Sequence, residues 1–283
     1  MNDPQSLAWL TLTLGAFLTF TPAPAGATKT TDRALMPAAQ AGRANATTRL
    51  LTEGADLETA DAQGRTFLET AVASGQTDAV NMLVLAGADV NARAPNGTTA
   101  LHIAAASGNT DIVKALIGAG ARVDVADQNG NEPLHMAVRH STNTEIVKAL
   151  LDAGAKVDVA NNDGMQPLHL AARSAHVATV QTLLASGANP NADGLHGLRP
   201  LHLVAQDGAG RMNAALASAH GGHKLRKLLY GLEYITVVKV LLSNGAGFDV
   251  EDTNGKRPID YASEGGFSEM VDLLLAAGAK PPR

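Results

Sequence analysis

The chain contains no cysteine, which excludes disulfide frameworks, thiolate nucleophiles and cysteine-bound metal sites. This absence does not decide the compartment, because a chain without cysteine folds in oxidising and reducing surroundings alike. Aromatic residues are scarce as well. They make up 3% of the chain, against 45% for all hydrophobic residues, so the apolar share comes mostly from Ala, Leu and Val. We therefore expect a thin core in which neighbouring elements approach one another closely.

An excess of positive charge and the common catalytic sequence patterns are also missing. Lys and Arg number 22 against 27 Asp and Glu, which gives a formal net charge of -5 and disfavours general nucleic-acid binding. The chain has no G-x-S-x-G nucleophile elbow, no phosphate-binding G-x-x-x-x-G-K-[ST] and no metal-binding H-E-x-x-H. We predict a protein that is not an enzyme, takes no cofactor and has no nucleic-acid partner.

The N-terminal segment has the pattern of a secretory signal peptide. Fourteen residues from Leu7 to Phe20 carry no charge, and the small residues Ala25-Gly26-Ala27 follow. A helix that spans a bilayer needs about 20 apolar residues, so this run is too short for a stable anchor. The alternative is a buried first helix of the fold, which Pro22 and Pro24 disfavour. We predict a signal peptide over residues 1–27 and an exported protein, periplasmic or secreted, with no stable membrane insertion after cleavage.

A regular repeat is the main signal in the rest of the sequence. Leu-His pairs recur in steps of 33, 34 and 33 residues, at His102, His135, His169 and His202. Gly-Ala pairs keep the same period, beginning at Gly54, Gly87, Gly120, Gly154, Gly187, Gly245 and Gly278. One step in this second series is 58 residues long, which predicts about 25 inserted residues between Gly208 and about Leu232.

Each period is typical of two short helices followed by a chain reversal. In the period that starts at Gly97, apolar residues at helical spacing predict one helix over residues 99–107 and a second over residues 110–119. Gly108 and Gly120 are expected to end them in the left-handed conformation that glycine tolerates. The pair Asn129-Gly130 then favours a tight turn.

The repeated segments TALHIAA, EPLHMAV, QPLHLAA and RPLHLVA, each followed by LL or LI and then GA, resemble ankyrin repeats over about residues 33–280. The resemblance implies an all-α solenoid of about seven helix-turn-helix repeats linked by short β-hairpin loops. The first repeat diverges, because Met36 and Pro37 stand where its helix would continue. The expected parts are a signal peptide (1–27), a divergent first repeat or cap (28–63), repeats two to five with the start of six (64–207), an insertion (208–232), and the rest of repeat six with a capping repeat (233–283).

The periodic histidines are interpreted as structural. The resemblance implies that successive repeats lie about 10 Å apart, so these imidazoles cannot share a zinc ion, which needs bonds of about 2 Å. We expect each ring to satisfy backbone groups in the first turn of its helix. The family's capping Thr is replaced at Glu132, Gln166, Arg199 and Arg257. We expect each loss to cost about 0.5–1 kcal/mol and to expose charge on the hairpin side.

The insertion contains two further candidates. His220 and His223 supply only half of a tetrahedral metal shell, so a flexible glycine turn is favoured and no metal site is predicted. Leu225, Leu228, Leu229 and Leu232 follow helical spacing beside Lys224, Arg226 and Lys227, which predicts an amphipathic helix with a basic face. The favoured interpretation is an elongated second helix of repeat six whose leucines pack on the stack. Docking to an acidic partner or a membrane surface stays open.

The resemblance also implies a concave binding face built from hairpin tips and first helices. On this face we expect a partly positive, partly apolar patch that binds a protein with an acidic patch. Its predicted members are Arg139, His140, Asn162, Asp163, Met165, Arg173, Ser174, Leu195, His196 and Leu198. We predict a monomeric interaction scaffold. The alternatives are an immunity-type inhibitor of an exported toxin, a helper of a periplasmic enzyme, and a metal- or membrane-responsive module.

Overall fold

The structure, a computed structural model, describes residues 37–38, 41, 55–61, 63–140, 143–217 and 223–283. The side chains of residues 140, 209, 211–217 and 223–230 are outside this description. The predicted signal peptide and most of the predicted divergent repeat fall outside the described residues. Within that repeat, the described residues Pro37 and Ala38 are helical.

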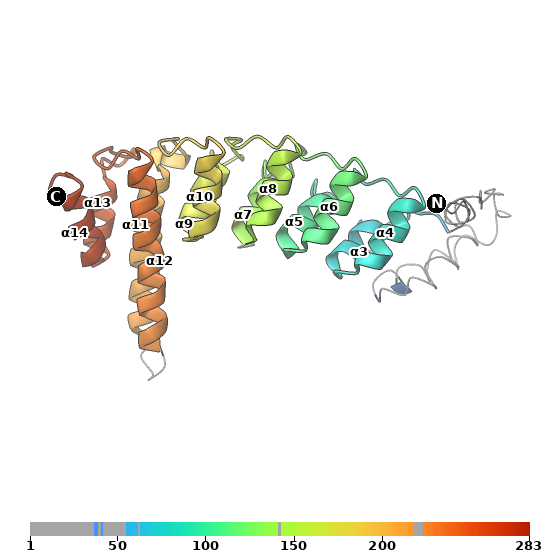
Figure 1. The fold of residues 1–283 in the computed structure, drawn as a ribbon, viewed down its shortest axis with the longest axis horizontal. Helices are drawn as coiled ribbons and strands as arrows, with labels where there is room; N and C mark the ends of the chain where they lie inside the picture. Colours follow the sequence, from blue (N-terminus) through green and yellow to red (C-terminus); the bar gives the residue numbers. More distant parts are fainter. Residues whose placement is uncertain (1–36, 39–40, 42–54, 62, 141–142, 218–222) are drawn as a thin grey trace, which may run out of the picture.

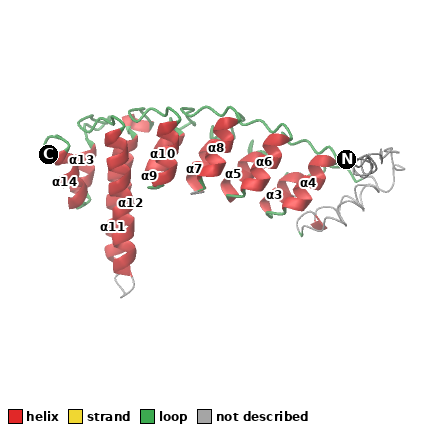
Figure 2. Cartoon of the chain, in the orientation of Figure 1, coloured by secondary structure: helices red, strands yellow, loops and turns green. Residues whose placement is uncertain are grey.

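Helices stacked in pairs form an elongated array (Figure 1). The described part of the chain contains helices and loops but no strand (Figure 2). The first helices of the pairs are α3 (Phe67–Ala73), α5 (Ala100–Ser107), α7 (Pro133–His140), α9 (Pro167–Arg173), α11 (Pro200–Ala217) and α13 (Pro258–Glu264). The second helices are α4 (Thr77–Leu85), α6 (Thr110–Gly118), α8 (Thr144–Asp152), α10 (Val177–Ala185), α12 (His223–Ser243) and α14 (Ser268–Ala276).

Small side chains allow the pairs to pack closely. In α5, Leu101, Ala104 and Ala105 are fully buried, and α5 packs directly against α3 and α7. The second helix α6 buries Ile112 and Leu116 and packs against α4 and α8. The bounds of α5 and α6 agree with the predicted helices to within one residue. The thin, alanine-rich core expected from the composition is thus an interface between adjacent repeats.

The loops between pairs are hydrogen-bonded turns that link neighbouring repeats. In repeat four, the N–H of Asp127 donates to the carbonyl of Asn131 at 2.9 Å, which closes the reversal. Adjacent loops are joined by backbone bonds from Gln128 to Asn96 at 2.9 Å and from Asn162 to Asn129 at 3.0 Å. These loops therefore form a continuous row along one edge of the stack without forming strands.

The structural role predicted for the histidines agrees with the hydrogen bonds. Nδ1 of His135 accepts from the backbone N–H of Glu132 at 3.1 Å, and Nε2 lies 3.1 Å from the carbonyl of Met165 in the next repeat. His102, His169 and His202 make the equivalent pairs of bonds. A neutral ring with its proton on Nε2 satisfies both partners. Each imidazole therefore starts its own helix and ties that helix to the following repeat.

The expected exposure of charge at the altered caps is wrong for two of the residues. Glu132 is buried, at 8% exposure, and one of its carboxylate oxygens has no hydrogen-bond partner. Arg257 is 3% exposed, and its Nη2 donates to Asp260 at 3.0 Å and to the carbonyl of Pro281 at 2.8 Å. Asp260 stands where the histidine occurs in other repeats, and it provides Arg257 with a buried partner that the periodic pattern did not predict.

The inserted residues lengthen both helices of repeat six into a helical arm, defined here as α11 beyond Gly208 together with α12 before Tyr234. The arm extends well past the other pairs on the side away from the row of loops (Figure 1). The prediction of an elongated second helix is correct, but the first helix continues as well. Leu232 is 63% exposed, so it does not pack on the stack as expected.

A close contact positions the base of this arm. A Cβ atom at Gly208 would lie 3.0 Å from a ring atom of Phe267 and 3.1 Å from one of Tyr234. Both rings are almost fully buried, and the hydroxyl of Tyr234 donates to the carbonyl of Arg173 at 3.1 Å. Glycine therefore lets α11 approach α12 and the turn before α14 where the arm leaves the stack.

The metal-site candidates in the arm lie outside the described side chains, since His220 is not described and only the backbone of His223 is. Among the residues that the structure does describe, no group of three His, Asp or Glu side chains is placed to hold a metal ion. Within the same residues, none of the helices combines the length and apolarity needed to span a bilayer.

Candidate functional site

Two adjoining hollows lie between the row of loops and the first helices at the middle of the stack. Their volumes are about 290 and 170 Å³, and they share Arg139, Asn161 and Asp163. We call their combined lining the central groove. Its residues are Asn129, Asn131, Arg139, Asn161, Asn162, Asp163, Met165, Leu170, Arg173, Leu195, Leu198, Leu203 and Gln206. The groove therefore crosses the loops of repeats four to six and helices α7, α9 and α11.

One end of the groove is polar and consists largely of asparagine side chains. Asn161 Nδ2 donates to Oδ1 of Asn131 at 2.9 Å, and Asn162 Nδ2 donates to the carbonyl of Gln128 at 3.0 Å. These bonds hold two of the amides in place between adjacent repeats. The side chain of Asn129 is exposed and makes no hydrogen bond within the described residues. This end therefore offers a free amide on a fixed polar wall.

The other end has an apolar floor. Met165, Leu170 and Leu203 are each less than one-tenth exposed, and Leu198 is half-buried. Leu195 stands at the rim and is 46% exposed. This end of the groove therefore combines a buried apolar floor with one exposed apolar side chain at its rim.

The charged side chains of the groove differ in their partners. Arg139 is exposed and has no ion pair or hydrogen bond among the described residues. Arg173 Nε lies 2.7 Å from Oδ2 of Asp207, so this second predicted cation is partly neutralised inside the protein. Asp163 is exposed and forms no ion pair with Arg139. Arg139 is therefore the cation of this groove that is left for an external partner.

The loop of repeat six has a different shape from the loops around it. Asp127 in repeat four accepts from two backbone N–H groups at 2.8 Å, but Gly194 occupies the equivalent position in repeat six. A side chain at Gly194 would lie 3.0 Å from the carbonyl oxygen of Leu198 and from the sulfur of Met165. His196 then takes a left-handed conformation with φ 58°, which is strained for a residue with a side chain. Leu195, the residue before His196, lies at the rim of the groove.

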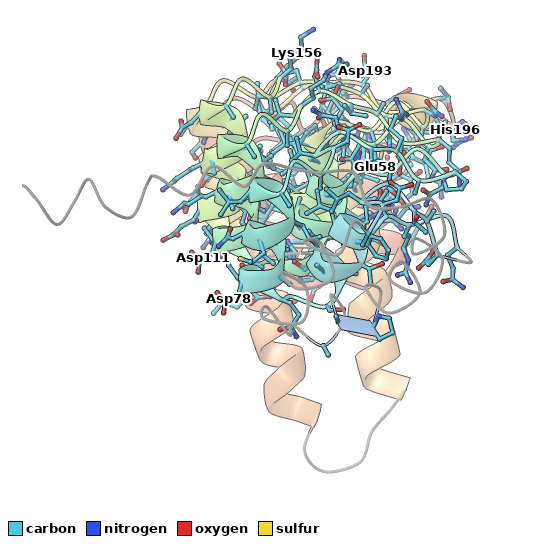
Figure 3. All side chains as sticks on the ribbon, turned by 90° about the vertical axis from the view of Figure 1, so that its right-hand side faces the viewer. Glu58, Asp78, Asp111, Lys156, Asp193 and His196 are labelled. Carbon is cyan, nitrogen blue, oxygen red and sulfur yellow. The ribbon has the colours of Figure 1, made fainter. Side chains whose placement is uncertain are left out.

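Seven of the predicted contact residues line the central groove: Arg139, Asn162, Asp163, Met165, Arg173, Leu195 and Leu198. Ser174 and His196 do not line it. The side chain of His140, the last residue of α7, is outside the described part. His196 lies on the side of the stack opposite Asp78 and Asp111, which begin the second helices α4 and α6 (Figure 3).

Sequence reasoning missed six groove residues: Asn129, Asn131, Asn161, Leu170, Leu203 and Gln206. The period itself offered a signal, because Asn129 and Asp163 occupy equivalent positions in successive repeats, as do Leu170 and Leu203. The two leucines read as ordinary core residues of a helix, and they are indeed buried. Leu170 and Leu203 line the groove because the loop of repeat six leaves a space beside them.

Comparison with known proteins identifies the family. The model of the family described as ankyrin repeats (3 copies) matches residues 13–94, 87–161 and 140–227, which is more than half of the chain. The chain therefore belongs to the ankyrin-repeat family. Ankyrin repeats are protein–protein interaction modules, so family membership indicates a scaffold that binds other proteins.

Individual relatives are more distant. The chain is similar to YahD of Escherichia coli (strain K12), described as an ankyrin repeat protein, with 43% identity over 49 residues. This match spans 17% of the chain and 24% of YahD. Among solved structures, the chain is similar to the human ASB11 ankyrin repeat domain with a TM-score of 0.70 and 24% identity. That similarity covers 87% of this chain and 98% of the domain, and it establishes the fold alone.

Proposed function

We propose that this chain is a non-enzymatic binding protein that holds a protein partner in the central groove. The observation that carries the proposal is the free cation Arg139 beside an apolar floor at the middle of the stack. Binding energy in protein interfaces is concentrated at central arginine and large apolar side chains, which is the combination present here. The groove has no residue that we assign to catalysis.

We place this binding outside the cytoplasm. The uncharged run from Leu7 to Phe20 and the small residues before Thr28 support export followed by cleavage. Mass spectrometry of the protein recovered from an expressing bacterium tests this part separately. A mature N-terminus at Thr28 is expected, and an intact N-terminus would contradict export by this route.

Charge reversal in the groove tests the binding proposal. The chain is used as bait against the extracellular or periplasmic fraction of its source. Captured proteins are compared between the natural sequence and the double variant Arg139→Glu, Arg173→Glu. We expect at least one captured protein to be lost or weakened about tenfold or more in the double variant, because charge reversal replaces a favourable contact with repulsion between like charges.

Lys148→Glu is the matched control, because Lys148 is exposed on the second helix α8, away from the groove. Capture should be the same with this variant as with the natural sequence. If every captured protein survives the double reversal, the central groove is not the binding site.

Scaffold, inhibitor and helper are forms of this same proposal, since each requires the groove to hold another protein. The activity of the captured partner, measured with and without the chain, distinguishes them. A blocked partner indicates an immunity-type inhibitor, and a stabilised one indicates a helper. None of the described side chains favours the metal- or membrane-responsive alternative.

A further inference from the structure

The two hollows of the central groove differ in chemistry, and the difference constrains what can occupy them. Their volumes, about 290 and 170 Å³, fall below the range of roughly 300–1,000 Å³ that is usual for small-molecule sites. Each is open to solvent along the groove and shares Arg139 with the other. An extended segment of polypeptide that places one side chain in each hollow fits these dimensions better than a single compact ligand.

The smaller hollow requires an apolar side chain. Its floor is Met165, Leu170 and Leu203, all buried, and its rim is Leu195, which is 46% exposed. A large aliphatic or aromatic side chain placed there would cover the exposed part of Leu195 and remove the apolar floor from water. The Gly194 loop that raises Leu195 to this rim is strained at His196, which is common where a loop is shaped for binding.

Arg139 is placed to bind a carboxylate. Its guanidinium is exposed, faces both hollows and has no partner among the described residues. Arg173 borders the same apolar hollow, and its Nε is already paired with Asp207 at 2.7 Å. Arginine binds carboxylates through two parallel N–H groups, so an acidic side chain would be held in a defined orientation.

Asp163 has a separate role at the junction of the hollows. It is an exposed carboxylate that would repel an acidic side chain if the two were adjacent, but it can accept the backbone N–H of an extended peptide. The exposed amide of Asn129 can both donate to and accept from such a backbone. The free polar groups of the groove therefore match a peptide main chain, while Arg139 matches one acidic side chain.

We infer that the central groove recognises an extended peptide segment in which a large apolar residue lies close in sequence to an Asp or Glu. The apolar side chain enters the hollow beneath Leu195, and the carboxylate pairs with Arg139. The inference rests on the proposed function, because it specifies the partner chemistry of the same groove.

Selection from a library of short random peptides displayed on phage tests this inference. The purified full chain is the target, and selected peptides are synthesised and measured by fluorescence anisotropy. We expect enrichment of peptides with a large aliphatic or aromatic residue close to Asp or Glu. Replacing the acid by its amide, or the apolar residue by Ala, should weaken binding by about tenfold or more.

Variants of the chain show whether selected peptides use the groove. Arg139→Gln should abolish the preference for acid over amide, and Leu195→Ser should weaken binding of every selected peptide. Both side chains are exposed, so neither change removes core packing. The controls are Lys148→Gln on α8 and Leu85→Ser, since Leu85 is 84% exposed at the end of α4. The controls should leave binding unchanged.

The inference is overturned if selection enriches basic peptides, enriches peptides without the acidic and apolar pair, or enriches none. It is also overturned if Arg139→Gln leaves the preference for acid intact. These outcomes are distinct from failure of the proposed function. If capture of a protein partner depends on the groove while peptide selection fails, the groove binds a folded surface, and the inference alone is wrong.

Discussion

At the scale of single residues, Glu132 is an unfavourable choice for the position it occupies. It stands where a capping Thr occurs in repeat three, it is buried, and one of its carboxylate oxygens has no hydrogen-bond partner. Burial raises the pKa of this carboxyl, the nearby Asp124 raises it further, and Lys156 opposes them. A buried carboxylate without full hydrogen bonding destabilises the folded state at neutral pH.

Replacing Glu132 by Thr should therefore stabilise the protein. The new side chain reproduces the arrangement of Thr99 with His102, where the hydroxyl lies 2.9 Å from Nδ1. We expect the free energy of unfolding at pH 7 to rise by about 1–2 kcal/mol. Because the folded pKa of Glu132 is raised, the penalty applies where the carboxyl is ionised, and the gain should shrink as the pH falls toward 4.

Urea unfolding of the natural sequence and the variant at both pH values measures this difference. The reverse change Thr99→Glu is the control and should destabilise the protein at pH 7. A variant Glu132→Thr that is less stable than the natural sequence would mean that the carboxylate has a stabilising partner.

At the scale of elements, the helical arm is joined to the stack at a crowded point. Gly208 faces the rings of Phe267 and Tyr234 at 3.0–3.1 Å, whereas a Cβ at Gly210 would meet no atom within 4 Å. Both glycines lie inside α11. Substitution of each glycine by Ala therefore distinguishes two effects. The higher helix propensity of Ala applies at both positions, and the cost of overpacking applies only at Gly208.

Gly210→Ala should stabilise the protein by about 0.5–1 kcal/mol, because Ala is the better helix former. Gly208→Ala gains the same preference but forces two buried rings to move, which costs about 1–3 kcal/mol. We expect Gly208→Ala to be at least about 1 kcal/mol less stable than Gly210→Ala in chemical denaturation. Equal stabilities would show that the rings move freely.

Removal of the arm should leave the stack intact. Gly208 and Tyr234 make the contacts at its base, so a chain in which residues 210–231 are replaced by a short turn keeps both. We expect cooperative thermal unfolding and a helical circular dichroism spectrum reduced only by the missing turns. Loss of cooperative unfolding would mean that the inserted residues belong to the core of repeat six.

At the scale of the whole molecule, four buried histidines connect neighbouring repeats. Burial is the main cause that lowers the pKa of His102, His135, His169 and His202 below the ordinary value of 6.5. Each ring stays neutral in the folded state, whereas the unfolded chain binds protons as the pH falls below about 6.5. Acidification therefore favours the unfolded state at four interfaces together.

The free energy of unfolding should be constant above about pH 7.5 and decrease between about pH 6.5 and 5.5. Each histidine contributes a slope of up to about 1.4 kcal/mol per pH unit. Urea titrations across this range measure the slope. His135→Gln lowers stability throughout but should also reduce the slope, since one titrating group is lost. An unchanged slope in this variant would contradict the assignment to buried imidazoles.

The stacked fold could be predicted because the residues that determine it recur at a regular spacing along the chain. The Leu-His and Gly-Ala periods located the helices of repeat three to within one residue and placed the insertion. The longer α11 was missed because the inserted residues were assigned to an elongated second helix, and the close approach of Gly208 to Tyr234 and Phe267 has no periodic counterpart. The burial of Arg257 was missed because its partner Asp260 replaces a periodic histidine.

The groove could be predicted only in part, because some of the contacts that shape it join different repeats and leave no local sequence pattern. Arg139 and Arg173 were recognisable as unusual side chains on the expected face, but the ion pair of Arg173 with Asp207 joins two repeats and leaves no local pattern. Leu195 was recognisable as an apolar residue at a loop tip. The hollow that it shares with Leu170 and Leu203 lies beside a loop where His196 has a positive φ, which the sequence pattern does not specify.

The crowded base of the arm is the pivot about which the rest of the arm would tilt. The ten residues of α11 from Gly208 to Ala217 extend about 15 Å beyond their pivot, so a small tilt at the glycine becomes a larger sweep at the far end. Tyr234 is part of this pivot and also donates to the carbonyl of Arg173, at the edge of the groove. The base of the arm and the last residue of α9 are therefore joined by a side-chain hydrogen bond, so the arm is anchored to the helix that also carries a groove cation.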